Sequence, residues 1–179
     1  MGRDKAFLPW EGAPLFEKVL RIFSESFPEV LLVGGDAERF GKYGVRLVPD
    51  IYPGSALGGL YSGLFHATHQ HIFVASCDMP YPSAPLLRYL CSLKGDYDCV
   101  VPQTEQALEP LFAVYGKSTL PAMLDLLGSG NLRIYDLYPQ LRTRYVACDE
   151  LAPFAENGRS FINVNTPDEF ALLAKETIS

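Results

Sequence analysis

The stretch Phe73-Val74-Ala75-Ser76-Cys77-Asp78-Met79-Pro80 is a short apolar run that stops on a lone aspartate and a proline. Such a run is typical of a buried parallel strand, whose carboxyl end opens into a loop that can bind a ligand. A carboxylate at that end suits Mg²⁺, which takes one or two protein carboxylates and leaves its other positions to water and substrate phosphates. The alternative is that Asp78 and Pro80 simply end the strand and start a turn. Asp78 is therefore a candidate metal ligand.

Strand and helix patterns alternate on both sides of this stretch. Short apolar runs predict strands at 30–33, 45–48, 72–75, 98–102, 111–115, 142–147 and 161–164. Helical periodicity predicts helices at 14–27, 60–68, 85–93 and 119–127, with a shorter one at 132–138. This alternation predicts an α/β fold, a three-layer α/β/α sandwich with a mostly parallel, Rossmann-like sheet.

Length and composition narrow the class of protein. The 179 residues fit one domain, and 15 Lys and Arg against 21 Asp and Glu give a net charge of −6, which argues against a nucleic-acid partner. The sequence has no apolar run long enough to span a membrane and no signal-peptide pattern at its start. We therefore expect a cytoplasmic protein without a membrane partner.

A second carboxylate, Asp50, also follows a predicted strand. The sequence then runs into Gly58 and Gly59 at the start of a helix. Glycines let backbone amides approach a ligand closely, and a helix N-terminus favours anions. These residues predict a phosphate or nucleotide site, although an ordinary loop between a strand and a helix remains the alternative.

Four further polar residues are candidates for ligand binding. Asn163 and Asn165 alternate with apolar residues, so in a strand their amides would lie on one side, where they could bind a polar ligand or satisfy a strand edge. Lys5 could neutralise a triphosphate, and Arg133 could hold an anion at a helix start. For Lys5 and Arg133 the alternative is an ordinary surface side chain.

Taken together, these motifs resemble the molybdenum cofactor guanylyltransferases. The resemblance extends over essentially the whole chain and is carried by Met1-Gly2-Arg3-Asp4-Lys5-Ala6, Trp10-Glu11-Gly12-Ala13-Pro14-Leu15, Asp50, Leu57-Gly58-Gly59, Cys77-Asp78-Met79-Pro80, Glu109-Pro110-Leu111-Phe112-Ala113-Val114-Tyr115 and Asn163-Val164-Asn165-Thr166-Pro167.

The resemblance implies a nucleotide-diphospho-sugar transferase fold and a Mg²⁺-dependent transfer of GMP from GTP to molybdenum-molybdopterin. The guanine dinucleotide form of the cofactor is made and pyrophosphate is released. GTP and molybdopterin are then the substrates, and molybdoenzymes or cofactor-carrier proteins are further partners. The implied roles are catalysis and phosphate contact for Lys5, Mg²⁺ binding and catalysis for Asp78, nucleotide binding for Gly34, Asp50, Gly58 and Gly59, and pterin binding for Asn163, Asn165 and Arg133.

One departure from the family pattern concerns the start of the chain. The family signature begins with an apolar strand and a Leu-Ala-Gly-Gly loop, followed by Ser-x-Arg-Met-Gly, and this sequence starts at that Met-Gly. We expect residues 1–179 to be a single nucleotidyltransferase domain that lacks the first strand and the phosphate loop, and the natural protein to extend upstream. A stop codon in place of that segment would contradict this expectation. The chain as given should bind nucleotide weakly and be impaired in catalysis.

Two alternatives remain open at this point. A cytidylyltransferase of the same fold would act on the molybdenum cofactor or on a sugar or polyol phosphate. A non-catalytic protein would keep the fold and bind the nucleotide or the pterin without releasing pyrophosphate.

Overall fold

The computed structural model describes residues 7, 9–10, 12–155, 159–162 and 164. The strands are β1 (Pro9–Trp10), β2 (Ala13–Pro14), β3 (Leu31–Val33), β4 (Arg46–Val48), β5 (His71–Ala75), β6 (Cys99–Pro102), β7 (Phe112–Gly116) and β8 (Thr143–Val146). The α-helices are α1 (Leu15–Ser26), α2 (Ala37–Phe40), α3 (Ala56–His66), α4 (Ala84–Ser92), α5 (Leu120–Gly128) and α6 (Cys148–Leu151). Short 3-10 helices are η2 (Gly41–Tyr43), η3 (Lys117–Thr119), η4 (Ile134–Gln140) and η5 (Arg159–Phe161).

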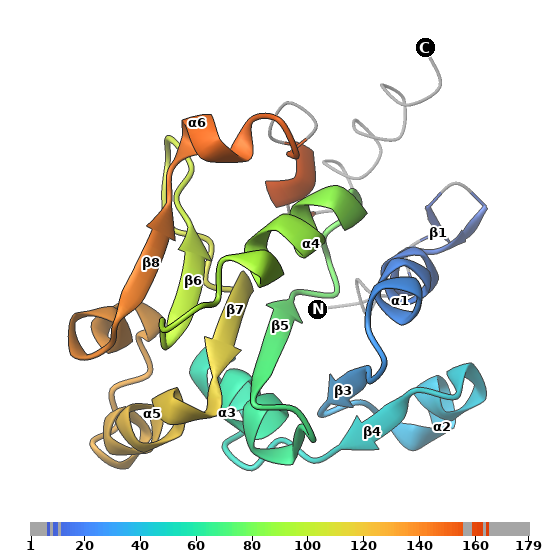
Figure 1. Cartoon of the computed structure of the whole chain (residues 1–179). Helices are drawn as coiled ribbons and strands as arrows, with labels where there is room; N and C mark the ends of the chain where they lie inside the picture. Colours follow the sequence, from blue (N-terminus) through green and yellow to red (C-terminus); the bar gives the residue numbers. More distant parts are fainter. Residues whose placement is uncertain (1–6, 8, 11, 156–158, 163, 165–179) are drawn as a thin grey trace.

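The main sheet has the strand order β5-β7-β6-β8 (Figure 1). Because β5 and β6 both pair antiparallel with β7, and β8 pairs parallel with β6, three strands run in one direction and β7 runs in the other. The strands β3 and β4 form a separate parallel pair, and β1 and β2 form an antiparallel hairpin. Within the described residues, no helix is both long and apolar enough to cross a bilayer.

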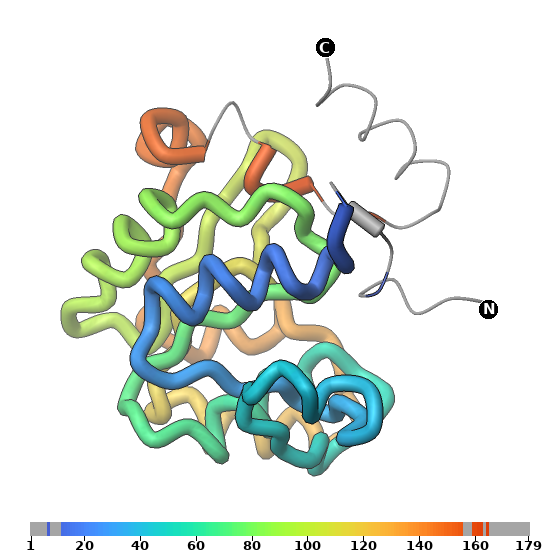
Figure 2. Tube along the Cα trace, turned by 90° about the vertical axis from the view of Figure 1, so that its right-hand side faces the viewer, coloured from blue at the N-terminus to red at the C-terminus, as the bar shows by residue number. Residues whose placement is uncertain are grey.

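Helices cover both faces of the main sheet. Along β7, Ala113 and Tyr115 belong to a core with α3 and α5, whereas Phe112 and Val114 belong to a core with α1 and α4. Side chains alternate along a strand, so a strand that is apolar throughout supplies both cores. The helices α1 and α4 lie beside each other on one of these faces (Figure 2). The predicted three-layer α/β/α architecture with a mostly parallel sheet is confirmed.

A smaller third core belongs to the β3–β4 pair. Phe16 of α1 packs edge-on against Phe40 and Tyr43, with ring centroids 4.9 Å and 5.2 Å apart. About one and two turns further along the same helix, Val19 and Phe23 belong to the core that lies between α1, α4 and the main sheet. The single helix α1 therefore packs against both β-structures.

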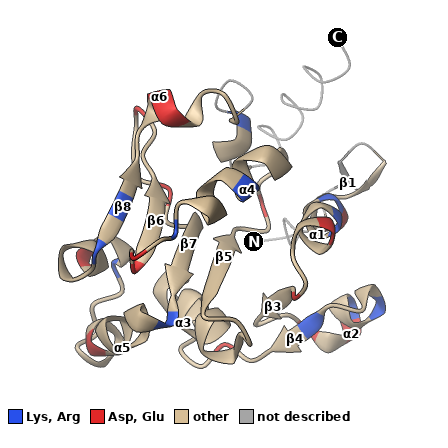
Figure 3. Ribbon diagram, viewed as in Figure 1, with Lys and Arg blue, Asp and Glu red and all other residues tan. Residues whose placement is uncertain are grey.

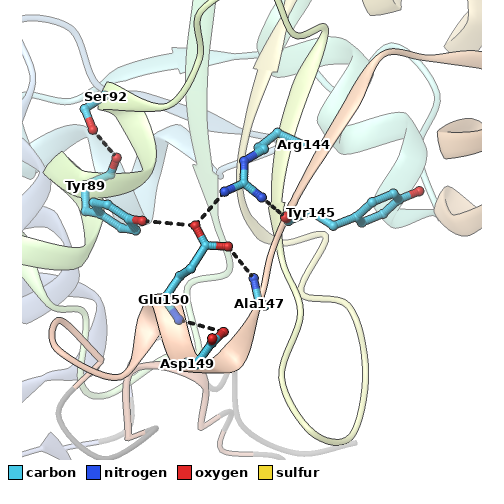
Figure 4. A network of polar contacts seen from close by, with 7 residues as sticks. All are labelled: Tyr89, Ser92, Arg144, Tyr145, Ala147, Asp149 and Glu150. Carbon is cyan, nitrogen blue, oxygen red and sulfur yellow. Dashed lines mark hydrogen bonds and ion pairs between the residues drawn. The ribbon is translucent and has the colours of Figure 1, made fainter.

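A network of polar contacts connects α6 and α4 to strand β8 (Figure 4). Glu150 Oε2 lies 2.5 Å from Arg144 Nη2 and accepts a 3.4 Å hydrogen bond from Tyr89, while Oε1 accepts one from the N–H of Ala147 at 3.4 Å. Burial and the neighbouring Glu150 carboxylate raise the pKa of Tyr89, whose ring also stacks on Phe154 with 4.3 Å between centroids. These contacts hold the outer edge of the sheet together.

Most predicted elements are present, and two differ in type. In place of the α-helix predicted at 132–138, the structure has the 3-10 helix η4 (Ile134–Gln140), with Pro139 inside it. The strand predicted at 161–164 is wrong at its start, because Phe161 ends the 3-10 helix η5 and packs its ring against Phe112 at 5.5 Å. The inward packing of Phe161 on the core competes with the extended conformation that its alternating sequence suggested.

Asp98, the residue just before β6, should contribute stability that depends on pH. Although burial opposes its ionisation, hydrogen bonds from the backbone N–H of Arg142 and from Ser118, with the Arg142 side chain, lower the pKa of Asp98. Since a lowered pKa stabilises the fold above the unfolded pKa, this contribution should disappear as the pH falls through the lower folded value. Asp98→Asn should cost about 1–2 kcal/mol in the free energy of unfolding at pH 7, and much less at pH 3, in urea titrations.

The exposed neighbour Asp96 provides the control for this experiment. Asp96→Asn should change stability little at either pH. An equal loss for Asp98→Asn at pH 7 and pH 3 would contradict the electrostatic account.

Candidate functional site

Gly34 and Asp50 meet at the ends of the two neighbouring strands β3 and β4. The N–H of Gly34 donates to the carbonyl of Val48 at 2.9 Å, and a Cβ at Gly34 would lie 3.5 Å from the Cβ of Asp50. Gly34 has a φ of 68°, a left-handed conformation that favours glycine. The chain can therefore turn at this point beside the Asp50 carboxylate.

A buried serine connects Asp50 to helix α3. Asp50 Oδ1 accepts hydrogen bonds from the N–H of Tyr52 at 3.1 Å and from Ser62 Oγ at 3.0 Å. Ser62 Oγ also accepts the N–H of Ile51 at 2.8 Å and lies 2.7 Å from the carbonyl of Gly58. Ser62 is fully buried, so this network fixes the loop after β4 against α3.

The two adjacent glycines near the start of α3 differ in what surrounds them. The helix starts at the Ser55 cap, whose hydroxyl accepts the N–H of Gly58 at 2.9 Å, so Gly58 and Gly59 lie inside its first turns. A Cβ at Gly58 would lie 1.9 Å from the carbonyl oxygen of Tyr52, whereas a Cβ at Gly59 would meet nothing within 4 Å. Gly58 is thus required by packing, and Gly59 leaves open space.

Asp78 lies just beyond the carboxyl end of β5. Its carboxylate accepts a hydrogen bond from Ser76 Oγ, and its backbone carbonyl accepts the N–H of Val164 at 3.0 Å. The N–H of Ser76 donates to the carbonyl of Leu111 at 3.0 Å, which places the turn before β7 beside this strand end. Asp78 is half-buried between these segments.

Another carboxyl group, that of Glu109, belongs to the turn before β7. Glu109 precedes Leu111 by two residues, and its backbone N–H donates to the carbonyl of Pro102 at 2.9 Å. Burial raises the pKa of the Glu109 carboxyl, and a hydrogen bond with Thr104 works in the opposite direction. Two acidic side chains, Asp78 and Glu109, therefore lie at this end of the main sheet, and they have different hydrogen-bond partners.

A cavity between β3 and β5 connects the two groups of residues. We name it the β3–β5 cavity, and its lining includes Val33, Ala56 and Gly59 on one side and Ser76 and Cys77 on the other. The N-terminal end of α3 and the residue next to Asp78 thus open onto one space. An eleven-residue helix with its first turn at that space offers backbone N–H groups to an anion.

Two cationic side chains lie beside the loop that follows Asp78. Arg159 Nη2 donates to the Tyr81 hydroxyl at 3.0 Å, and the Arg159 guanidinium lies 4.3 Å from the centroid of that ring. The ammonium of Lys18 is 5.5 Å from the same ring centroid. Positive charge from α1 and η5 is therefore present near the end of β5.

The structure does not bring all predicted site residues together. Gly34 lies beside Asp50, and Ser62 links Asp50 to Gly58 through hydrogen bonds. Gly59 and Cys77, the residue before Asp78, line the β3–β5 cavity. Arg133 is exposed at the start of η4, and its described hydrogen bond, from its N–H to Asn131 at 3.1 Å, stays within that turn. The remaining predictions, Lys5, Asn163 and Asn165, lie outside the described residues.

A metal ion at this site would have one protein carboxylate. Over the described part of the chain, no three His, Cys, Asp or Glu side chains converge as a metal cage. A single oxygen ligand such as Asp78 is compatible with Mg²⁺, which commonly binds through one or two carboxylates together with water and phosphate oxygens. It does not suit Zn²⁺, which needs at least three nitrogen, sulfur or oxygen ligands from the protein.

Sequence reasoning did not predict the role of Ser62, nor the contacts of Lys18 and Arg159 with Tyr81. Ser62 gives one local signal, a lone hydroxyl in the apolar run Leu60-Tyr61-Ser62-Gly63-Leu64, where a buried polar atom needs a partner. The contacts between Lys18, Tyr81 and Arg159 give no local signal, since the three residues come from distant parts of the sequence.

Ser62→Ala should destabilise the protein. The substitution leaves the N–H of Ile51 without the buried hydroxyl that accepts it and removes one hydrogen bond from Asp50, at a cost of about 1–3 kcal/mol. Thermal and urea unfolding measure this cost. Ser92→Ala is the matched control, because Ser92 is exposed and its hydroxyl bonds to the carbonyl of Tyr89 in its own helix. Equal stability of the two variants would contradict the structural role of Ser62.

The comparison with protein families gives a clear assignment. The family model described as "MobA-like NTP transferase domain" matches residues 1–143 of the chain. This match covers well over half of the 179 residues. The chain belongs to the MobA-like NTP transferase family.

Sequence relatives agree with this assignment. A probable molybdenum cofactor guanylyltransferase from Pelotomaculum thermopropionicum is 35% identical over 170 residues, which cover 94% of this chain and 83% of the relative. A molybdenum cofactor guanylyltransferase from Vibrio parahaemolyticus is 29% identical, over 95% of this chain and 86% of the relative.

Solved structures give the same fold. Molybdopterin-guanine dinucleotide biosynthesis protein A from Archaeoglobus fulgidus superimposes with a TM-score of 0.84 at 26% identity, over 99% of this chain and 91% of that protein. A 2-C-methyl-D-erythritol 4-phosphate cytidylyltransferase from Thermus thermophilus superimposes with a TM-score of 0.69 at 16% identity, over 98% of this chain and 94% of that protein, which supports the fold alone.

Proposed function

We propose that this protein is a molybdenum cofactor guanylyltransferase, which transfers GMP from GTP to molybdenum-molybdopterin and releases pyrophosphate. The observation that carries the proposal is the 35% identity to a relative of that name over 94% of the chain. The position of Gly34, Asp50 and Asp78 at strand ends, with Gly59 and Cys77 in the lining of one cavity, supports it, because ligands of open α/β sheets bind at the carboxyl ends of the strands.

We assign the nucleotide to the side of the cavity formed by β3 and α3, next to the loop that follows β4. Gly34, Asp50 and Gly59 line the guanosine and ribose, and the first turn of α3 faces phosphate. Gly58 supports this site from within, since its close contact with Tyr52 holds the loop on the helix. Asn163, Asn165 and Arg133 remain proposed contacts of the molybdopterin half.

The proposed reaction is an in-line displacement at the α-phosphorus of GTP by the terminal phosphate of molybdopterin. A Mg²⁺ ion held by Asp78 would neutralise charge that develops on the phosphate oxygens. Lys5 would add positive charge to the phosphates, and Lys18 and Arg159, which lie at the Tyr81 ring, would add more on the Asp78 side. A phosphate nucleophile is already ionised near neutral pH, so the side chains need only bind and orient the two substrates.

The experiment that tests this function compares GTP with CTP. Protein, molybdenum-molybdopterin and either nucleotide are incubated with and without Mg²⁺, and pyrophosphate and the dinucleotide product are measured. A guanylyltransferase should prefer GTP by about a hundredfold or more in kcat/KM, because a site that pairs its polar groups with the purine edge rejects a pyrimidine. Preference for CTP would overturn the proposal, and binding without pyrophosphate release would favour a non-catalytic protein.

A further inference from the structure

The carboxyl group of Glu109 has no part in the proposed reaction, yet it lies at the same end of the main sheet as Asp78. The strands β5, β6 and β7 carry no Lys, Arg, Asp or Glu (Figure 3), so the charged groups at this end come from the loops. Asp78 follows Ser76 by two residues, Glu109 precedes Leu111 by two, and Ser76 and Leu111 are hydrogen-bonded to each other. Because two residues span at most about 7 Å, both acids lie close to that hydrogen bond.

Glu109 lacks the cation that accompanies comparable carboxylates. Three other half-buried acids of the described chain each pair with an arginine: Glu29 with Arg46, Asp98 with Arg142 and Glu150 with Arg144. Glu109 is half-buried as well, but within the described residues no lysine or arginine forms an ion pair with it. A carboxylate that is withdrawn from water without a counter-ion is unfavourable unless hydrogen-bond donors surround it.

The hydrogen bonds of Glu109 are also incomplete. A carboxylate has about four lone-pair sites that can accept hydrogen bonds. Among the described residues, the side-chain partner of Glu109 is the Thr104 hydroxyl, whose one proton is donated to the carbonyl of Ala107 at 2.9 Å. Burial raises the pKa of Glu109, as expected for a carboxyl group with so few donors around it. Most acceptor sites of this carboxylate are therefore available to donors from a ligand.

The strand order places Glu109 on the acceptor side of Asp78. The cavity that we assign to the nucleotide lies between β3 and β5, whereas Glu109 belongs to the segment between β6 and β7, on the other side of β5 (Figure 1). The hydroxyl of Tyr135, in η4, donates to the carbonyl of Leu108 at 3.1 Å, so the segment that follows Arg133 lies beside Glu109. Glu109 is thus adjacent both to the Asp78 segment and to a segment proposed to contact molybdopterin.

The pterin ring of molybdopterin carries a matching pair of donors. Its pyrimidinone half presents the N3–H and the 2-amino group side by side, much as a guanidinium presents two of its N–H groups. A carboxylate accepts such a pair through both oxygens, and hydrogen bonds of this charge-assisted kind are strong. Guanine presents the same pair of donors, but the nucleotide is assigned to the opposite side of β5.

On the basis of that proposed function, we infer that Glu109 binds the pterin ring of the acceptor by accepting the N3–H and the 2-amino group through its two carboxylate oxygens. Glu109 then determines specificity for the second substrate, while Asp78 and the cations near Tyr81 act at the phosphates. The two donors of the pterin take the place that an arginine has at the other half-buried acids.

Two small pteridines separate this contact from general binding. Pterin has the 2-amino group, whereas lumazine has a carbonyl oxygen in that position and keeps the N3–H. The carboxylate of Glu109 matches pterin and repels the lumazine oxygen, so the protein should bind pterin at least about tenfold more tightly than lumazine. Binding of each compound is measured by its own fluorescence, with and without Mg²⁺-GTP.

Glu109→Gln should abolish this preference. Glutamine has the same shape but offers one acceptor and one donor, which match the N3–H and the C2 carbonyl of lumazine and cannot accept both donors of pterin. Pterin should therefore bind at least about tenfold more weakly than to the unchanged protein, and lumazine more tightly. Misfolding would weaken both ligands, so opposite changes in the two affinities exclude it. Glu105→Gln is the matched control, because Glu105 is exposed in the same loop, and this variant should keep the preference for pterin.

The affinity for Mg²⁺-GTP tests the alternative in which the carboxylate binds guanine. In Glu109→Gln this affinity should be unchanged, while the KM for molybdenum-molybdopterin should rise at least about tenfold. Weaker binding of GTP with unchanged binding of pterin would overturn the assignment to pterin. Equal binding of pterin and lumazine by the unchanged protein, or a Glu109→Gln variant that keeps the preference for pterin, would overturn it as well.

The pteridine measurements and the transfer reaction can fail separately. If the protein prefers pterin through Glu109 but releases no pyrophosphate, the proposed reaction is contradicted and the Glu109 contact is supported. If Glu109→Gln transfers GMP with an unchanged KM for molybdenum-molybdopterin and binds both pteridines as the unchanged protein does, the Glu109 contact is overturned and the reaction is supported.

Discussion

Replacing Gly58 by alanine should destabilise the protein by about 3 kcal/mol or more. The added Cβ would lie 1.9 Å from the carbonyl oxygen of Tyr52 and 2.9 Å from its carbonyl carbon, and backbone atoms cannot move aside as a flexible side chain can. The loop after β4 would have to leave helix α3, which would also break the contacts of Ser62 with Asp50 and Ile51. Urea or guanidinium unfolding monitored by circular dichroism measures the change.

The adjacent glycine is the matched control. Gly59→Ala introduces the same methyl group into the same helix, but nothing lies within 4 Å of its position. Alanine is the better helix former, so this variant should be neutral or more stable by up to about 1 kcal/mol. A Gly58→Ala protein as stable as Gly59→Ala would show that the contact with Tyr52 is relieved at little cost.

Asp78→Asn should lower kcat/KM for Mg²⁺-dependent transfer from GTP at least about a hundredfold, because the amide lacks the negative charge by which Asp78 is proposed to hold the Mg²⁺ ion on the phosphates. Stability should change little, since the asparagine oxygen can still accept the hydrogen bond from Ser76 and the backbone bond to Val164 is untouched. Steady-state pyrophosphate release and titration with Mg²⁺-GTP measure the two effects.

Asp125→Asn controls for the loss of one negative charge, since Asp125 is exposed on α5. It should leave both measurements unchanged. If Asp78→Asn binds its ligands and works as well as the control, the protein is not a metal-dependent transferase that uses this carboxylate.

The fold was predictable to the extent that its signals are local. Ser83 and the two prolines around α1 predicted helix boundaries to within two residues, because a cap or a proline acts on the turn next to it. The direction of β7 was not predictable, since an apolar run buried on both faces reads the same in either orientation. Neither was the 3-10 turn at Phe161, whose position depends on a ring contact with Phe112, far away in sequence.

The candidate site also contains residues that local sequence predicted and residues whose roles depend on tertiary contacts. Asp50 and Asp78 stood out because each directly follows an apolar strand, and the structure places each at a strand end. Gly58 was predicted to let a ligand approach, but its close neighbour is the protein's own Tyr52 carbonyl. The roles of Ser62 and of Arg159 beside Tyr81 depend on tertiary contacts, which a single sequence does not encode locally.

The division of α1 between two cores has a consequence for the lifetime of the protein. Phe16, Phe40 and Tyr43 form a small aromatic cluster, separate from the larger cores around the main sheet. A segment with few buried side chains opens at a lower free energy than a large sheet does. Proteases in the cell should therefore cleave first in the region of β3, β4 and α2, and degradation should follow the opening of this region, well before global unfolding.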